Sequence, residues 1–280
     1  MHTGNSRFIS MEHSIHPELL TKQVNVLVVG AGGTGSRVIE ALVNLHRALI
    51  AKGHPGGLNV TAMDADIVSQ SNIGRQAFYQ PDVGTYKAIT LVNRANMALN
   101  GTAVWKASTD LLDESTNLRD FQLVIGAVDN RLARYAIMQA MMKTSYKMAY
   151  WLDFGNKTSQ GQAILGEIAA DRRAMREINR LPHAGELFPD LVNPLVTNDD
   201  DGPSCSLAEA LERQSLYINQ AVTIQGMSIL WNLFTKGVIN NHGAFIDLDQ
   251  STVLPMRIDP THWARFGFKP KAPRKKAQTA

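Results

Sequence analysis

Three glycines follow a short run of valine and leucine, and their spacing is the first feature of the sequence that could do chemistry. After residues 24–29, Gly30, Gly32 and Gly35 form the pattern G-x-G-x-x-G. Glycine permits a tight turn, a close approach of backbone to a phosphate, and close packing of a helix on a strand. A helix that begins near Thr34 would direct its first N–H groups at an anion. The spacing predicts a nucleotide-binding loop, although a glycine-rich turn that only packs has the same pattern.

Two acidic residues at the end of the next apolar stretch are candidates for binding a ribose. Residues 58–63 have the composition of a second strand, which delivers Asp64 and Asp66 to its carboxyl end. In dinucleotide-binding folds an acidic residue at this place binds the ribose hydroxyls, usually about 20 residues after the glycines. The interval is longer here because the predicted intervening helix continues to about residue 51. Asp64 is the first choice for this role and Asp66 the second.

The single cysteine, Cys205, is a candidate nucleophile. A chain with a single cysteine can form neither an internal disulfide nor a cysteine-rich zinc site of its own. Cys205 directly precedes a long predicted helix, at about 206–236. The dipole and free N–H groups of a helix N-terminus favour a thiolate and lower the pKa of a thiol placed there. The alternative is a buried cysteine that acts as a small hydrophobic side chain.

The alternation of apolar segments predicts the fold that positions these residues. Residues 24–29 are too continuously apolar for a strand with one solvated face, so they indicate a strand buried on both sides of a parallel sheet. Further helices are expected at 86–99 and 131–146, and further strands near 103–107, 121–127, 148–154, 162–168, 244–248 and 252–257. Alternating strands and helices predict a doubly wound α/β fold, with a mostly parallel Rossmann-like sheet, a long crossover loop and C-terminal strands.

Composition and charge narrow the class of protein. Of the 280 residues, 44% are hydrophobic and 19% charged, which is ordinary for a soluble globular protein. The formal charge of +3 arises from five basic residues near the C-terminus, and without them the chain carries −2. A basic tail of this kind is a weak indication of nucleic acid as a partner. The absence of a run of about 18 apolar residues and of a signal peptide predicts a cytoplasmic protein without membrane contact.

The predicted organisation is a single domain with two appendages. Residues 1–22 form an N-terminal arm, 23–260 the main domain with a mobile loop at 181–205, and 261–280 a basic, disordered tail. Long loops in compact domains are usually functional or mobile.

Five short motifs in a fixed order resemble those of the ThiF/MoeB/E1-like activating enzymes. They are GAGGTGS at 30–36, DAD at 64–66, NIGRQ at 72–76, DVGTYK at 82–87 and DN at 129–130. The likeness covers about residues 20–240, and within the group the chain looks most like the ThiF-type proteins of bacterial PRTRC gene cassettes. Such enzymes use ATP and Mg²⁺ to adenylate the C-terminal carboxylate of a ubiquitin-like or sulfur-carrier protein that ends in glycine. The resemblance therefore implies an E1-like adenylation domain and an ATP-dependent adenylyltransferase.

The resemblance also implies roles for the motif residues. A carboxylate nucleophile is already ionised, so catalysis must come from positioning and from charge placed against the phosphates. Arg75 and Lys87 would supply this charge, Asp129 would coordinate Mg²⁺, and Arg134 would support Asp129. Asn72 and Gln76 would position phosphates or Arg75. The full set expected to bind the nucleotide is Gly30, Gly32, Gly33, Gly35, Asp64, Asp66, Asn72, Gln76 and Asn130.

Each assignment has a structural alternative. Arg75 and Lys87 are residue types that usually form solvated surface charges. Asp129 and Asn130 could simply cap the helix that follows them. Their joint occurrence after the glycine loop, in a fixed order, favours the functional interpretation.

The segment around Cys205 indicates how far the reaction proceeds. PSCSL at 203–207 resembles the cysteine segment of E1 enzymes that form a thioester with their carrier, but Ser206 replaces the usual threonine and a following proline is missing. The resemblance implies acyl transfer to Cys205, an E2-like acceptor and a homodimer. The zinc-binding CxxC pairs of many relatives are absent, so no structural zinc is expected.

Two other functions remain open on the sequence alone. An NAD(P)-dependent Rossmann oxidoreductase would account for the glycine loop and the acidic residue after the second strand, but it leaves Arg75 and Lys87 unexplained. A non-catalytic scaffold would keep the fold and nucleotide binding while it serves to bind a partner protein.

Overall fold

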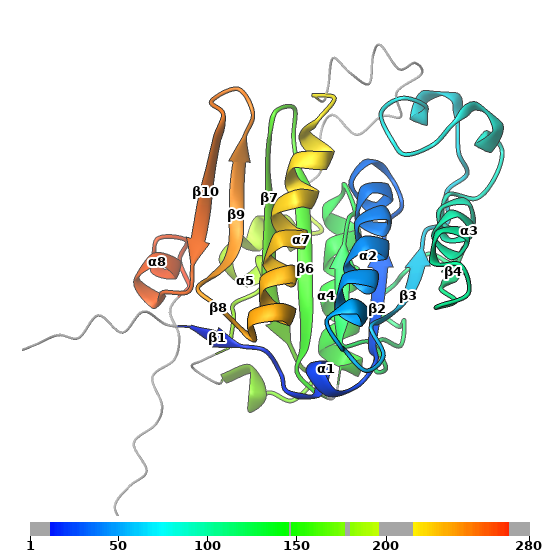
Figure 1. Cartoon of the computed structure of the whole chain (residues 1–280). Coiled ribbons are helices and arrows are strands. Elements are labelled where there is room, and N and C mark those ends of the chain that lie inside the picture. Colours follow the sequence, from blue (N-terminus) through cyan, green and yellow to red (C-terminus); the bar gives the residue numbers. More distant parts are fainter. Residues whose placement is uncertain (1–11, 146, 177–179, 196–214, 269–280) are drawn as a thin grey trace, which may run out of the picture.

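An eight-stranded sheet forms the centre of the fold (Figure 1). The structure is a computed structural model that describes residues 12–145, 147–176, 180–195 and 215–268. The strand order is β10-β9-β7-β6-β5-β2-β3-β4. The strands are β2 (Val24–Val29), β3 (Leu58–Met63), β4 (Lys106–Ser108), β5 (Leu123–Gly126), β6 (Ala149–Asn156), β7 (Gln160–Ile168), β9 (Asn241–Asp247) and β10 (Thr252–Arg257).

The predicted α/β class and mostly parallel sheet are confirmed. Strands β6, β5, β2, β3 and β4 run parallel, and β7, β9 and β10 extend the sheet in antiparallel order. In the register of the central strands, Val26 lies opposite Val60 on one side and Leu123 on the other. All residues of β2 except the half-buried Asn25 are buried, as the apolar sequence predicts.

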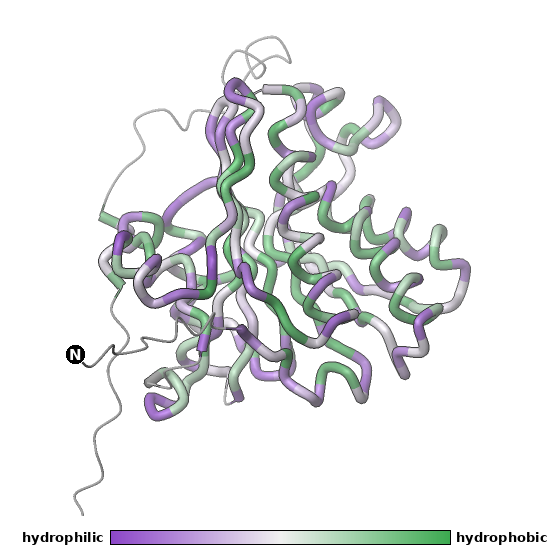
Figure 2. The backbone as a smooth tube through the Cα atoms, turned by 60° about the vertical axis from the view of Figure 1, so that its left-hand side comes forward, coloured by the Kyte–Doolittle hydropathy of each residue, from purple (hydrophilic) through white to green (hydrophobic). Residues whose placement is uncertain are grey.

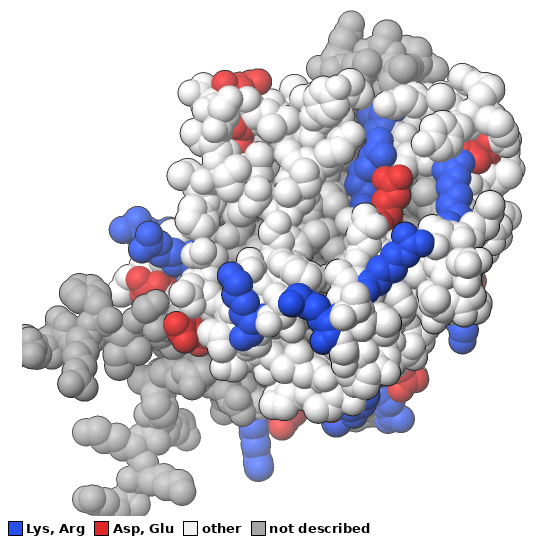
Figure 3. Space-filling view, in the orientation of Figure 1, with Lys and Arg blue, Asp and Glu red and all other residues white. Residues whose placement is uncertain are grey.

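Helices cover both faces of the sheet, and the alternating side chains of β2 show which helix covers which face. Val26 and Val28 share one apolar cluster with residues of α2 (Gly33–Ala51), α3 (Lys87–Leu99) and α7 (Ile218–Lys236). Leu27 and Val29 share the other with residues of α4 (Arg131–Thr144). In Figure 2 apolar residues concentrate along the central strands and the inward sides of the helices. Figure 3 shows charged side chains over α2 and α3, while the surface over α7 is largely uncharged.

Short elements complete the fold. β1 (His13–Ser14) pairs antiparallel with β8 (Val238–Ile239) and forms a small second sheet. The remaining elements are α1 (Glu18–Thr21), α5 (Ala184–Leu187) and α8 (Pro260–Ala264), with the 3₁₀ turns η1 (Gln70–Asn72), η2 (Gln80–Asp82), η3 (Ala174–Arg176) and η4 (Pro189–Val192). None of the described helices has the length and apolar character needed to cross a bilayer.

The prediction of one helix from about 206 to 236 is wrong. α7 begins at Ile218, and residues 215–217 before it are not helical. The backbone N–H of Ser215 donates to the carbonyl of Thr158 at 2.6 Å, which ties the chain to the β6–β7 turn just before the helix starts. Residues 206–214 and Cys205 lie outside the described residues. α7 therefore begins 13 residues after Cys205, and its N-terminus is not the helix end that the sequence analysis placed beside the thiol.

His242 is a fully buried histidine whose two ring nitrogens have opposite roles. Its Nδ1 lies 2.7 Å from the carbonyl oxygen of Leu165, to which it can only donate. Its Nε2 accepts from the Nε1–H of Trp263 at 2.8 Å. These contacts fix the neutral tautomer, because a proton on Nε2 would face the indole donor. The pKa of His242 is lowered to about 4, chiefly by burial. The hydrogen bond to Leu165 and the charge of Glu167 oppose this shift, whereas His13 and His262 add to it.

Acidification is therefore expected to destabilise the protein through His242. The folded-state pKa lies below the unfolded value of 6.5, so this contribution is complete above pH 6.5 and is lost as the pH falls towards 4. When the pH falls from 7 to 5, we expect the titration of His242 to lower the free energy of unfolding by about 2 kcal/mol. Denaturant unfolding at both pH values measures the difference. In His242→Gln, whose amide can still donate and accept hydrogen bonds, the difference between the two pH values should be smaller by about 2 kcal/mol. An unchanged difference would contradict the role of His242.

Candidate active site

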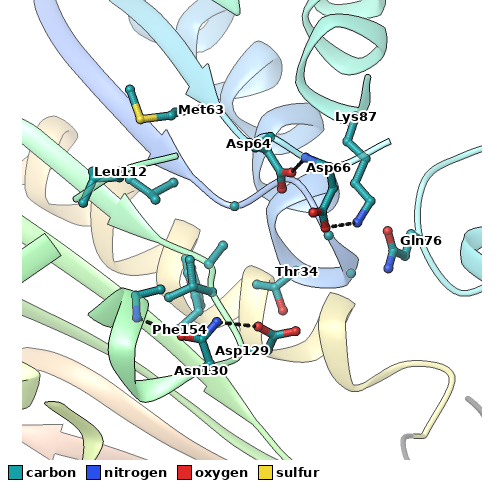
Figure 4. A pocket seen from close by; sticks show the side chains of 18 of the residues that line it. Thr34, Met63, Asp64, Asp66, Gln76, Lys87, Leu112, Asp129, Asn130 and Phe154 are labelled. Atoms are coloured by element: carbon teal, nitrogen blue, oxygen red, sulfur yellow. Dashed lines mark hydrogen bonds and ion pairs between the residues drawn. The ribbon is translucent and has the colours of Figure 1, made fainter. Parts of the chain in front are cut away.

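The carboxyl ends of β2, β3 and β5 meet around a cavity of about 250 Å³ (Figure 4). Parallel strands end at the same edge of the sheet, so the loops that follow them converge there. These loops and the starts of α2, α3 and α7 line the cavity. The lining includes Gly30, Gly32, Gly33, Asp64, Asp66, Arg75, Gln76, Lys87, Asp129 and Asn130 from the set predicted on sequence.

The glycine loop has separate packing and ligand-facing positions. Gly30 adopts a positive φ of 91°, and a Cβ there would lie 2.6 Å from the carbonyl oxygen of Ala127. A Cβ at Gly35 would lie 1.9 Å from the carbonyl oxygen of Gly30. At Gly32, in contrast, the nearest atom would be a side-chain nitrogen at 3.9 Å. Gly30 and Gly35 thus allow the turn to pack, while Gly32 faces the cavity.

The N-terminus of α2 opens onto the same cavity. The helix begins at Gly33 after the N-cap residue Gly32, which has no side chain with which to cap it. The first N–H groups of an uncapped helix carry partial positive charge and favour an anion. The predicted site for a phosphate lies at this helix end.

Asp64 holds the glycine loop in shape. Its Oδ2 accepts from the backbone N–H of Ala31 at 2.5 Å, and its Oδ1 accepts from the N–H of Asp66 at 2.8 Å. Burial raises the pKa of Asp64, and these two hydrogen bonds oppose that rise. Asp64 lines the cavity predicted for the ribose, but its observed hydrogen bonds are to the backbone.

Lys87 is a buried cation at the first turn of α3. Its side chain is only 9% exposed, and its Nζ donates to Oδ2 of Asp66 at 2.7 Å. Asp66 is exposed, and in Figure 4 its carboxylate joins the Lys87 ammonium beside the loop. The structure therefore gives Asp66 a contact with Lys87, whereas the sequence analysis assigned it only to the ribose.

Arg75 and Asp129 add opposite charges to the lining. Burial lowers the pKa of Arg75, and the nearby Asp129 carboxylate acts in the opposite direction. Asp129 is exposed, and its Oδ1 accepts from Nδ2 of Asn130 at 3.3 Å. Asn130 also caps α4, because its Oδ1 accepts from the N–H of Ala133 at 2.8 Å. Asn130 therefore caps the following helix, which was the structural alternative for this residue. Asp129 lies beside it and lines the cavity.

Three of the predicted residues lie elsewhere. Oδ1 of Asn72 accepts from the N–H of Ser69 at 2.9 Å and thereby caps η1, away from the cavity lining. Gly35 packs behind the loop and does not line the cavity. Arg134 supports another acid, since its Nε donates to Asp153 at 3.1 Å and not to Asp129. The predicted support of Asp129 by Arg134 is wrong. Burial raises the pKa of Asp153 to about 6, against the effect of Arg134.

A polar network that the sequence analysis missed joins α7 to the loop. Asn219 is 2% exposed, and its Oδ1 accepts from Thr34 Oγ1 at 2.9 Å and from Asn156 Nδ2 at 2.8 Å. A Cβ at Gly33 would lie 2.7 Å from the Asn219 amide, so Gly33 provides room for this contact. No local sequence signal could identify Asn219, because it comes from a helix 185 residues along the chain from Thr34.

The lining matches the chemistry of a magnesium-bound nucleotide. Two cations and a helix N-terminus would face phosphates, and the Asp129 carboxylate offers a hard oxygen ligand of the kind that Mg²⁺ prefers. Oε1 of Gln76 is buried without a hydrogen-bond partner among the described residues, in a side chain that lines the cavity. A polar ligand would satisfy this orphaned acceptor, so the residues fit such a group.

Several known proteins are similar to part of this chain. The sulfur carrier protein adenylyltransferase of Thermus thermophilus is 37% identical over 123 residues, which are 42% of this chain and 41% of that protein. The NEDD8-activating enzyme E1 catalytic subunit of Dictyostelium discoideum is 32% identical over 117 residues, covering 41% and 24%. The adenylyltransferase and sulfurtransferase of Candida albicans is 30% identical over 137 residues, covering 48% and 29%. The chain thus spans less than half the length of each of these relatives.

A sequence profile of the ThiF family matches residues 17–176. This range is more than half of the chain and includes the glycine loop, the acids after β3, Arg75, Lys87 and Asp129. The predicted resemblance is confirmed at this level, while the narrower likeness to PRTRC proteins stays a prediction. On this match and the similarity to adenylyltransferases, the chain belongs to the ThiF family.

Proposed function

We propose that this protein adenylates the C-terminal carboxylate of a small ubiquitin-like or sulfur-carrier protein that ends in glycine. ATP is the co-substrate, Mg²⁺ the metal and the cytoplasm the site of action. One observation carries the proposal: Arg75, Lys87 and Asp129 line a single cavity above the glycine turn. The similarity to a sulfur carrier protein adenylyltransferase supports the same reaction.

The proposed chemistry uses these groups to place charge. The triphosphate lies at the N-terminus of α2, with Arg75 and Lys87 against its oxygens. Asp129 would hold Mg²⁺, which neutralises phosphate charge when bound. The carrier carboxylate attacks the α-phosphorus, an oxygen–phosphorus bond forms, and the bond to the β-phosphate breaks to release pyrophosphate. No side chain has to remove a proton, because the nucleophile is already an anion.

Pyrophosphate exchange tests this proposal. The chain with ATP, Mg²⁺ and a glycine-tailed carrier should incorporate labelled pyrophosphate into ATP, and omission of the carrier should stop the exchange. Asp129→Ala is expected to lower the rate by about 10²–10³-fold. Asp190→Ala, which removes an exposed acid from η4, is the matched control and should exchange normally. Exchange that survives in Asp129→Ala would defeat the assignment.

Thermal stability separates this proposal from an oxidoreductase. ATP with Mg²⁺ should raise the unfolding temperature, because a ligand that binds only the native state stabilises it. NAD at the same concentration should leave it unchanged. Stabilisation by NAD alone would favour the oxidoreductase, and nucleotide binding without any exchange would favour a scaffold.

The proposal extends to transfer of the acyl group to Cys205, in a homodimer that serves an E2-like acceptor. The thiolate would attack the acyl adenylate, a thioester would form, and AMP would leave. A carrier conjugate that thiol reductants release is the expected product, and Cys205→Ala should abolish it while pyrophosphate exchange continues. Gel electrophoresis with and without reductant measures it. A conjugate formed equally by the alanine variant would assign the acceptor role to another residue.

A further inference from the structure

A second group of ligating side chains lies at the opposite end of the sheet from the nucleotide cavity. His13, His16 and Glu167 each present one nitrogen or oxygen, and these atoms lie within 4.8 Å of one another. Glu167 is near the end of β7, opposite Tyr150 at the start of β6, whereas the cavity lies beyond the carboxyl ends of β2, β3 and β5. Figure 1 shows β1, which carries His13, at the lower end of the molecule, away from the carboxyl ends of β2 and β3. The proposed adenylation makes no use of these residues.

Glu167 is a buried acid that needs a positive partner. Its side chain is 2% exposed, and its ion-pair partners within the described residues are His13 and His16, with no lysine or arginine among them. A buried carboxylate is costly unless it is paired. The compensating charge must come from a proton shared with the histidines or from a bound cation.

The contacts around the cluster orient its atoms for a cation. Nε2 of His16 lies 2.6 Å from Oε1 of Glu167, and Nδ1 of His13 lies 3.7 Å from Oε2. His13 Nε2 is 2.7 Å from the hydroxyl of Tyr150, and the backbone N–H of Leu181 donates to Oε2 at 2.6 Å. Metal-binding histidines commonly donate their second ring nitrogen to an oxygen, and ligating carboxylates are themselves hydrogen-bonded. With Nε2 as donor to Tyr150, Nδ1 of His13 directs its lone pair towards Glu167.

We propose that His13, His16 and Glu167 bind one Zn²⁺ ion. Two imidazoles and one carboxylate are a ligand set that zinc takes with a fourth position left for water, and the 23% exposure of His16 gives solvent access to it. In tetrahedral geometry ligand atoms stand about 3.4 Å apart, so side-chain shifts of about 1 Å bring the three into place. The metal replaces the proton now shared by His16 and Glu167, and that proton is released to the solvent. The absence of CxxC pairs excludes only a cysteine-bound zinc.

A metal at this site would link the segment that contains β1 to the central sheet. β1 pairs with β8 over only two residues, and so short a ladder is marginal on its own. His13 and His16 belong to this segment, whereas Glu167 belongs to β7. The His16 ring also stacks on Tyr150 at 4.6 Å between centroids. A metal held by both segments would cross-link them.

Zinc binding to the full chain tests the inference. Protein stripped with EDTA is incubated with excess Zn²⁺, desalted and analysed for metal. We expect one ion per chain, a higher unfolding temperature, and a visible absorption band of tetrahedral type when Co²⁺ replaces zinc. His16→Ala and Glu167→Gln should retain less than about one tenth of the zinc. Tyr150→Phe keeps the ring but removes the hydroxyl, and should weaken binding about 10–100-fold.

Two control variants make the outcome specific. His262→Ala removes a histidine of α8, and Cys205→Ser removes the only thiol that could bind zinc by itself; both should take up a full equivalent. Because Glu167 also bonds to Leu181, its variant could fail to fold, so the partly exposed His16 decides the result. No retained zinc, or equal zinc in His16→Ala, would show that the cluster is only a hydrogen-bonded network. Either result leaves the proposed adenylation untouched.

Discussion

Lys87→Ala is expected to lower pyrophosphate exchange by about 10²–10³-fold while the protein stays folded. The Lys87 ammonium is almost fully buried at the cavity and is held 2.7 Å from Asp66. A preorganised cation of this kind contributes most when negative charge develops beside it. The fold should survive because Asp66, the partner left behind, is exposed and can be solvated. Exchange assays and thermal unfolding, run on the same preparations, measure both parts.

Two further variants separate the contribution of the Lys87 charge from that of its partner Asp66. Lys106→Ala removes an exposed lysine in β4 and should exchange at the original rate. Asp66→Asn keeps Lys87 but weakens its positioning, so a smaller loss of exchange is expected than for Lys87→Ala. If Lys87→Ala exchanges normally, Lys87 is a structural cation and the proposed charge placement is wrong.

Gly35→Ala is expected to destabilise the protein by more than about 3 kcal/mol. The added Cβ would lie 1.9 Å from the carbonyl oxygen of Gly30, and an overlap with backbone cannot be relieved by a side-chain rotation. The loop would have to move as a whole, which would disturb the hydrogen bond from the N–H of Ala31 to Asp64. Denaturant unfolding at neutral pH measures the loss.

Gly32→Ala, in the same loop, should have the opposite pattern. Its new methyl group would meet no atom closer than 3.9 Å, so the loss of unfolding free energy should be smaller than in Gly35→Ala. The methyl group would enter the space predicted for a phosphate, so stabilisation by ATP with Mg²⁺ should be lost. Equal stability losses in the two variants would contradict this division of roles within the loop.

The sequence was sufficient to predict the central strands and the place of the cavity. Continuous apolar runs define buried parallel strands, and such strands end at one edge of the sheet. Once β2, β3 and β5 are assigned, the residues after them, including Asp64 and Asp129, must meet. Arg75 and Lys87 could not be placed in this way, since they follow irregular turns; their position rested on the order of the motifs.

Contacts between distant segments could not be predicted. Asn219 reaches the loop from α7, and Arg134 turns to Asp153 because the parallel pairing of β5 with β6 puts that acid within reach. Asn72 does not line the cavity for a local reason: its side chain bonds to a backbone N–H three residues away. Short polar side chains often form such bonds, and a motif does not reveal which partner prevails.

The hydrogen bond that Asp64 accepts from Ala31 has a thermodynamic consequence. It holds the backbone of the glycine loop in place before any ligand arrives, so binding does not have to order it. Ordering a flexible segment opposes association through lost conformational entropy, and a preorganised receptor avoids that loss. If the proposed function is correct, the Asp64 carboxylate raises the affinity for ATP without touching it.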